Sequence, residues 1–127
     1  MVKPKNTGPT GKELAILGIL WEKGPSTVHE MHEALHQKSE TGYTTTLKLM
    51  QIMLEKGLVV RDGAGRRHIY RPAESEEKTQ NRVVKELLGK AFAGSAEKLV
   101  MRALSVKKVS SEELNNIRKM LDEIEGA

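Results

Sequence analysis

The spacing of apolar residues changes at Gly57, and this change constrains the fold more than any other feature of the sequence. Before Gly57, apolar residues recur every three or four positions, which is typical of amphipathic helices. After Gly57, residues 58–62 are rich in β-branched side chains and residues 66–71 alternate up to Pro72, with Gly63-Ala64-Gly65 between the two runs. The sequence therefore predicts helices followed by one short β-hairpin.

Local capping and stop signals divide the segment before Gly57 into three helices. Thr10-Gly11-Lys12-Glu13 and Thr27-Val28-His29-Glu30 each have the spacing of a capping box. Gly24-Pro25 is expected to end the first helix, and Gly57 the third. The expected inner faces are Leu14, Leu17, Gly18 and Trp21 in the first helix and Val28, Met31 and Leu35 in the second.

The third helix, expected over residues 44–56, has a polar stripe opposite its apolar face. Thr44, Lys48, Gln51 and Glu55 share one side at the helical period, and Thr45 lies beside them. Gln can pair with the N6/N7 edge of adenine, Thr offers a hydroxyl or a methyl group, and Lys reaches phosphate or guanine. We predict that Thr44, Thr45, Lys48 and Gln51 contact DNA. The alternative is a solvated helix face without a partner. The opposite face, expected to be buried, holds Thr46, Leu47, Leu49, Met50, Met53 and Leu54.

The expected hairpin is basic, because Arg61, Arg66, Arg67 and Arg71 all lie in it. Three helices followed by such a hairpin is the element order of a winged helix-turn-helix, in which the third helix enters a major groove and the hairpin flanks it. Strand alternation allows only two or three of the four arginines to touch DNA at once. We predict contacts from Arg61, Arg66 and Arg67, with Arg66 best placed just after the turn. The expected fold class is mainly α with a small β-hairpin wing.

The net positive charge of the chain arises from its first part. Residues 1–72 carry 11 Lys and Arg against 7 Asp and Glu, whereas residues 73–127 carry 10 of each, so the net charge of +4 arises entirely before residue 73. The asymmetry favours a polyanion partner for the first part only. Ordinary variation of surface charge is the alternative, because +4 is small.

The second part of the 127-residue chain is expected to be a separate helical region. We predict a flexible tail at 1–9, a winged-helix DNA-binding domain at 10–72, a linker at 73–78 and a helical dimerisation domain at 79–127. Three amphipathic helices without a second layer cannot bury their apolar stripes alone, and a second copy of the same region would cover them. The residues expected at this homodimer interface are Val84, Leu87, Leu88, Phe92, Leu99, Val100, Leu104, Leu114, Ile117 and Leu121.

One pattern suggests a different function. His32-Glu33-Ala34-Leu35-His36 matches H-E-x-x-H, which places two imidazoles on one helix face for zinc, with Glu as general base. A zinc hydrolase also needs a third ligand and a substrate cleft, and Leu35 is needed for the small core. We therefore predict no catalytic residue, no metal site and no cofactor. A small zinc hydrolase and a winged helix that binds a protein instead of DNA are the alternatives.

Two further expectations concern the cellular setting. The chain has no Cys, which excludes disulfides, thiolate catalysis and thiolate metal clusters. The longest apolar run, residues 14–21, is far shorter than the ~20 residues of a membrane span, and no signal-peptide pattern is present. We expect a cytoplasmic protein without membrane contact. The aromatic side chains Trp21 and Tyr70 are expected to pack in the interior.

Four stretches of the chain resemble the BlaI/MecI/CopY family of penicillinase repressors. They are Leu20-Trp21-Glu22-Lys23-Gly24-Pro25, Gly42-Tyr43-Thr44-Thr45-Thr46-Leu47-Lys48, Glu55-Lys56-Gly57-Leu58-Val59 and Tyr70-Arg71-Pro72 with the preceding Gly65-Arg66. The resemblance runs from about residue 10 to the end. It implies a winged-helix domain, a C-terminal dimerisation domain and repression at a dyad operator, often with TACA/TGTA-like half-sites. It also implies DNA contacts by Thr44, Thr45, Lys48 and Arg66.

Three features depart from the pattern of that family. Many members carry Arg where this chain has Ile52, so Gln51 or Arg61 would have to supply the missing backbone contact. The cysteine-rich tail of copper-responsive members is absent. Arg102-Ala103 stands where β-lactam-responsive members have the Asn-Phe bond that a sensor-linked protease cleaves. The sequence therefore identifies neither the inducing signal nor a sensor or protease partner.

Overall fold

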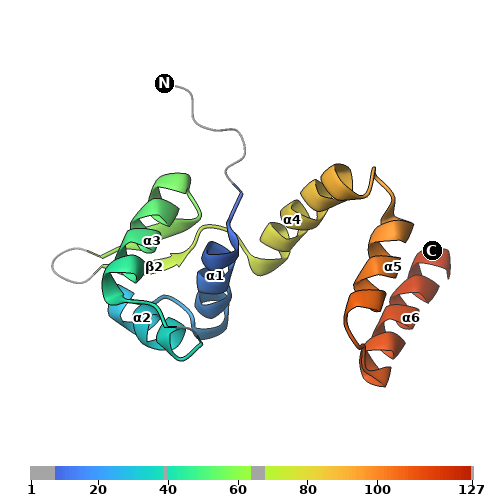
Figure 1. The fold of residues 1–127 in the computed structure, drawn as a ribbon, viewed down its shortest axis with the longest axis horizontal. Helices are drawn as coiled ribbons and strands as arrows, with labels where there is room; N and C mark the ends of the chain where they lie inside the picture. Colours follow the sequence, from blue (N-terminus) through green and yellow to red (C-terminus); the bar gives the residue numbers. More distant parts are fainter. Residues whose placement is uncertain (1–7, 39, 64–67, 127) are drawn as a thin grey trace. The chain divides into compact units, whose positions relative to one another are not determined.

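The computed structural model describes residues 8–38, 40–63 and 68–126. Residues 1–7 of the expected tail, and Arg66 and Arg67 of the expected hairpin, lie outside this part. The chain divides into two compact units, Met1–Val83 and Val84–Ala127. The elements follow one another in the order shown in Figure 1: α1 (Gly11–Lys23), α2 (Val28–His36), α3 (Tyr43–Lys56), β1 (Val59–Asp62), β2 (Ile69–Pro72), α4 (Glu76–Ala91), α5 (Ala96–Val106) and α6 (Ser111–Gly126).

Both expected capping boxes are present, which confirms the starts of the first two helices. The Thr10 hydroxyl accepts from the Glu13 amide at 3.2 Å, and the Glu13 carboxylate accepts from the Thr10 amide at 2.9 Å. Thr27 and Glu30 repeat this exchange at 3.2 and 2.8 Å. Each box satisfies two backbone N–H groups that a helix leaves without an intrahelical partner.

A left-handed glycine ends α3 and turns the chain into the hairpin. Gly57 has φ 80°, and its N–H donates to the carbonyls of Met53 and Leu54. The N–H of Leu58 also donates to the Met53 carbonyl, at 2.9 Å. These bonds satisfy the last carbonyls of the helix in a conformation that glycine adopts without a Cβ penalty.

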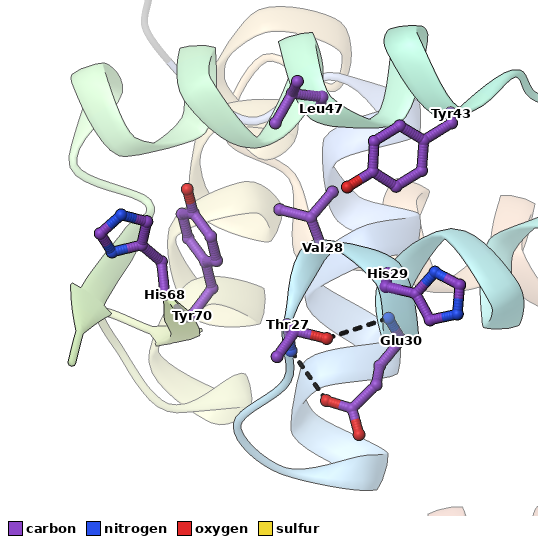
Figure 2. Close-up of a pocket in the computed structure, with 8 residues that line it drawn as sticks. All are labelled: Thr27, Val28, His29, Glu30, Tyr43, Leu47, His68 and Tyr70. Atoms are coloured by element: carbon purple, nitrogen blue, oxygen red, sulfur yellow. Dashed lines mark hydrogen bonds between the residues drawn. The ribbon is translucent and has the colours of Figure 1, made fainter. Parts of the chain in front are cut away.

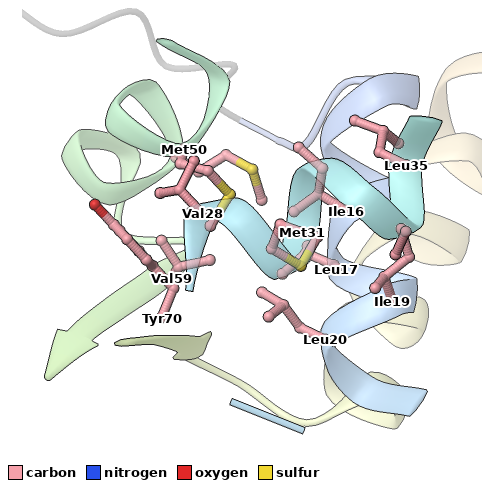
Figure 3. Packing of buried hydrophobic residues seen from close by; sticks show 12 residues of the cluster. Ile16, Leu17, Ile19, Leu20, Val28, Met31, Leu35, Met50, Val59 and Tyr70 are labelled. Carbon is pink, nitrogen blue, oxygen red and sulfur yellow. The ribbon is translucent and has the colours of Figure 1, made fainter. Parts of the chain in front are cut away.

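The hydrophobic core lies in the first unit, between α1, α2, α3 and the hairpin (Figure 3). In α2, the expected residues Val28, Met31 and Leu35 are buried. In α1, Leu17 of the expected face is buried, and Leu14 and Trp21 are partly buried and packed against the core. Helix α1 contacts both α2 and β2, so its buried surface is wider than the expected face. The buried apolar residues of α1 are Ile16, Leu17, Ile19 and Leu20.

The hairpin is attached to the segment between α1 and α2. Strands β1 and β2 are antiparallel, with Arg61 opposite Tyr70 and Asp62 opposite Ile69. Ser26 adds a single bridge to the other edge of β2, where its N–H and carbonyl exchange bonds with Tyr70 at 2.9 and 2.8 Å. Tyr70 is 3% exposed, which confirms its expected place in the interior.

The three C-terminal helices form with local caps. Helix α4 begins at Glu76, three residues before the expected start, because Ser75 accepts from the Lys78 amide and two carboxylates occupy the first turn. Ser95 and Ser110 cap α5 and α6 in the same way, at 3.1 Å each. Among the described residues, none is part of a helix long and apolar enough to cross a membrane.

Candidate nucleic-acid interface

Helix α3 presents a polar face to solvent and an apolar face to the core. Thr44, Thr45, Lys48, Gln51 and Glu55 are all exposed. On the opposite side of α3, Thr46, Met50 and Met53 are fully buried. The predicted division of this helix into two faces is therefore confirmed, and the exposed side chains are free to contact a ligand. We call Thr44, Thr45, Lys48 and Gln51 the recognition stripe.

Polar contacts hold both ends of α3. At the C-terminal end, the Nζ atom of Lys56 lies 2.9 Å from Oε1 of the buried Glu13 in α1. At the N-terminal end, the Thr46 hydroxyl donates to the Gly42 carbonyl at 3.3 Å and lies 3.3 Å from Nδ1 of His32 in α2. The helix that carries the recognition stripe is therefore held by polar contacts with α1 at one end and with α2 at the other.

One histidine of the H-E-x-x-H pattern, His32, contacts α3. The His32 ring lies edge-on to Tyr43, with centroids 5.4 Å apart, and 5.6 Å from the His36 ring. One nitrogen of His32 is already engaged with Thr46. Within residues 8–38, 40–63 and 68–126, no group of three or more His, Asp or Glu is placed to hold a metal ion. The pattern therefore lacks the third ligand that a zinc site requires.

The arginines of the hairpin are not equivalent. Arg61 is exposed on β1 and lies directly across the ladder from Tyr70. Arg71 is paired through Nε with Oδ2 of Asp62 at 2.6 Å, and both side chains are about half exposed. Sequence reasoning missed this pair, because it depends on the register of the two strands. Asp62 offsets the charge of Arg71, which leaves Arg61 as the unpaired arginine among the described residues of the hairpin.

A second polar cluster ties the start of α4 to α1. The indole N–H of Trp21 donates to the Glu74 carbonyl at 3.1 Å. The Glu74 carboxylate lies 2.7 Å from the guanidinium of Arg82. The hydrogen bond from Arg82, together with the charges of Arg82 and Lys78, lowers the pKa of Glu74 below 4.5 against a smaller opposing effect of desolvation. The same pair raises the pKa of Arg82.

Trp21 has two roles. Its ring packs against the core, and its indole N–H is a hydrogen-bond donor to Glu74.

Many apolar side chains of the second unit are exposed to solvent. No described residue of α5 or α6 is buried. Of the ten residues expected at a dimer interface, Leu88, Phe92, Leu99, Leu114 and Ile117 are half-buried within the unit. The other five, Val84, Leu87, Val100, Leu104 and Leu121, are 38–53% exposed. Four further apolar residues that the sequence reasoning left out of that set are also exposed: Met101, Val106, Met120 and Ile124.

A groove of about 530 Å³ lies beside α3 on the side of the hairpin (Figure 2). Sequence reasoning did not find it, because its walls come from three segments that only the fold brings together. The first turn of α2, the N-terminal half of α3 and the start of β2 each contribute side chains. The lining residues are Thr27, Val28, His29, Glu30, Tyr43, Leu47, His68 and Tyr70.

Three helices, a two-stranded wing and an exposed polar stripe on the third helix define a winged helix-turn-helix protein. Residues 9–123 match the penicillinase repressor family, and the chain belongs to this family. The transcriptional regulator BlaI of Mycobacterium tuberculosis is 29% identical over 115 residues, covering 89% of this chain and 82% of that protein. The penicillinase repressor of Bacillus licheniformis is 22% identical over 111 residues, covering 87% of each.

A solved structure also aligns with the chain. It is the homodimeric winged helix-turn-helix DNA-binding domain of a possible ArsR-family transcriptional regulator from Mycobacterium bovis, 22% identical, with a TM-score of 0.47 over 80% of this chain and 76% of that domain. Family membership makes this chain a transcriptional repressor and not an enzyme. The alternative of a zinc hydrolase is therefore excluded.

Proposed function

We propose that this repressor acts as a homodimer on a pseudo-palindromic DNA operator. Each copy would place α3 in a major groove, with the two helices about one helical turn, ~34 Å, apart. The observation that carries the proposal is the recognition stripe, four exposed polar residues on a helix whose other side and both ends are fixed. This proposal includes a cytoplasmic location, because a repressor must reach the chromosome that carries its operator.

The residues of the interface divide into two roles. Thr44, Thr45 and Gln51 carry hydroxyl and amide groups that suit base edges, so they would supply sequence preference. Lys48 and Arg61 carry charges that suit the phosphate backbone, and Arg66 and Arg67 of the wing are assigned the same role from the sequence. Phosphate contacts supply affinity that weakens with salt, with a slope of log K against log salt near −0.9 for each phosphate neutralised.

The homodimer is supported by the second unit. A unit in which no described residue is buried does not bury enough apolar surface to be stable alone. A second copy of the same helices would cover the exposed leucines and valines with an identical set, as closed two-fold symmetry requires. Dimerisation would then fix the spacing of the two recognition stripes, and an operator with dyad symmetry follows from it.

Selection of DNA from a random duplex library, at two salt concentrations, tests this function. The expected result is a dyad motif with half-sites about one turn apart, recovered more weakly at the higher salt. Lys48→Ala serves as the matched variant and should weaken binding to all recovered sequences. Recovery of no motif, with equal weak binding at both salts, would contradict the proposal.

A further inference from the structure

The groove beside α3 borders the recognition stripe. Tyr43 and Leu47, which line it, directly precede Thr44 and Lys48 in the chain, and on a helix they lie on the adjacent flank of the same surface. The other walls are the first turn of α2 and residues of β2 (Figure 2). Any DNA strand that runs along this side of α3 therefore passes the mouth of the groove.

Tyr70 gives the groove an unused polar atom. The residue is only 3% exposed, and its backbone N–H and carbonyl are both bonded to Ser26. Its phenolic hydroxyl has no hydrogen-bond partner among the described residues, although nearly all of the side chain is buried. Figure 2 shows this hydroxyl directed toward α3, on the groove side of the ring. No fully buried side-chain oxygen or nitrogen among the described residues lacks a hydrogen-bond partner, so the Tyr70 hydroxyl keeps some accessible surface and can donate to a ligand in the groove.

The remaining polar groups around the groove are mainly donors. In the first turn of α2, the amides of Thr27, Glu30 and Met31 are bonded, whereas those of Val28 and His29 have no acceptor among the described residues. Free amides at a helix start favour an anion. The Tyr43 hydroxyl and the imidazoles of His29 and His68 line the same groove. The carboxylate of Glu30 is the one acidic group of the lining, and it accepts from the Thr27 amide at 2.8 Å.

We propose that this groove binds one phosphodiester of the operator backbone, with the hydroxyl of the largely buried Tyr70 as one of its donors. This inference rests on the proposed DNA-binding function and adds to it a residue outside the recognition stripe and the wing arginines. A phosphodiester has only acceptor atoms, so it matches a set of hydroxyl, amide and imidazole donors. Its position beside α3 would fix the depth of the recognition stripe in the major groove without reading a base.

The test combines Tyr70→Phe with neutral methylphosphonates placed singly along the selected operator. The wild-type protein should lose affinity at one particular phosphate in each half-site. Tyr70→Phe should bind the unmodified duplex roughly tenfold more weakly, as expected for one lost bond to a charged group. A methylphosphonate at that phosphate should reduce the affinity of the variant much less than that of the wild type, because the substitution and the methylphosphonate remove the same contact. Losses at all other phosphates should be unchanged.

Two results would overturn the inference while leaving the proposed function intact. One is operator binding by Tyr70→Phe that equals that of the wild type. The other is a Tyr70→Phe variant whose affinity falls as much as that of the wild type at every modified phosphate. Failure of the wild-type protein to bind any duplex would overturn both proposals together.

Stability provides a second readout that does not involve DNA. Because no described residue forms a hydrogen bond with the Tyr70 hydroxyl, Tyr70→Phe should leave the urea midpoint of unfolding unchanged or raise it. Thr46→Val is the matched comparison, since the Thr46 hydroxyl is buried and bonded to Gly42, and its loss should lower the midpoint. A clear decrease for Tyr70→Phe would show that the hydroxyl has an internal partner and would contradict the inference.

Discussion

Lys56, in the last turn of α3, donates to the carboxylate of Glu13, in the first turn of α1, over 2.9 Å. The Glu13 side chain is 3% exposed, and the same oxygen also accepts from the Thr10 amide at 2.9 Å. The C-terminal end of the recognition helix is therefore fixed to α1 by a largely buried ion pair. Its orientation depends on this pair as well as on apolar packing, which makes the pair a direct target for substitution.

Lys56→Ala should destabilise the protein. It leaves the buried Glu13 carboxylate without its cation, at a cost of about 1–3 kcal/mol, below that of a fully buried pair because the Lys56 side chain is 24% exposed. Chemical denaturation measures this change. The matched control is Lys48→Ala, an exposed lysine on the same helix, which should keep wild-type stability and lose DNA affinity. Equal stability of the two variants would contradict the structural role of Lys56.

Gln51 and Glu55 share the exposed face of α3, but their substitution should change DNA binding in opposite directions. Gln51→Ala should relax preference at one base pair of the operator, with a cost of roughly 1–3 kcal/mol on the preferred base. Glu55→Gln should strengthen binding to all duplexes, since it removes a negative charge from the exposed face of α3 that is proposed to approach the DNA phosphates. Binding curves on operators with single base changes measure both effects. Uniform weakening by Gln51→Ala across these operators would exclude base reading by this residue.

The Glu74–Arg82 pair should contribute stability that depends on pH. Arg82 lowers the pKa of Glu74, so the contribution is present above the unfolded value near 4.5 and is lost as pH falls through the lower pKa of the folded state. Glu74→Gln should therefore unfold at a lower temperature than the wild type at neutral pH. The difference should shrink as the pH falls from neutral through the lowered folded-state pKa of Glu74. A difference in Tm that stays constant from neutral pH to acid well below 4.5 would contradict the predicted linkage.

Leu121→Glu should weaken self-association. Leu121 is 53% exposed on α6, and a carboxylate there would be costly to bury against a second copy. Sedimentation of the full chain should show a dimer for the wild type and a concentration-dependent shift toward monomer for the variant. Glu123→Gln, a neighbouring exposed position, should remain dimeric. If Leu121→Glu sediments as the wild type does, α6 is not part of the interface.

Features set by nearby residues could be predicted from the sequence. The capping boxes of Thr10 and Thr27 need only residues three positions apart, so the starts of α1 and α2 were predictable. The two faces of α3 were predictable for the same reason, because buried Met50 and Met53 are each only two residues, about half a helical turn, from exposed Lys48 and Gln51.

Features set by distant residues could not be predicted in this way. The buried surface of α1 depends on its two neighbours, so the periodic pattern through Leu17 did not include the buried Ile16 and Ile19. The pairs Glu13–Lys56 and Asp62–Arg71 require, respectively, the packing of two helices and the register of the hairpin. The groove around Tyr70 is assembled from three segments, so no local pattern points to it.

A dimer that holds two recognition stripes about one helical turn apart should be sensitive to the spacing of the operator half-sites. Affinity is measured for a selected operator and for the same operator with about 5 base pairs, half a turn, inserted at its centre. We expect a large loss of affinity, because the second half-site rotates to the opposite side of the duplex. Equal affinity for the two duplexes would contradict it.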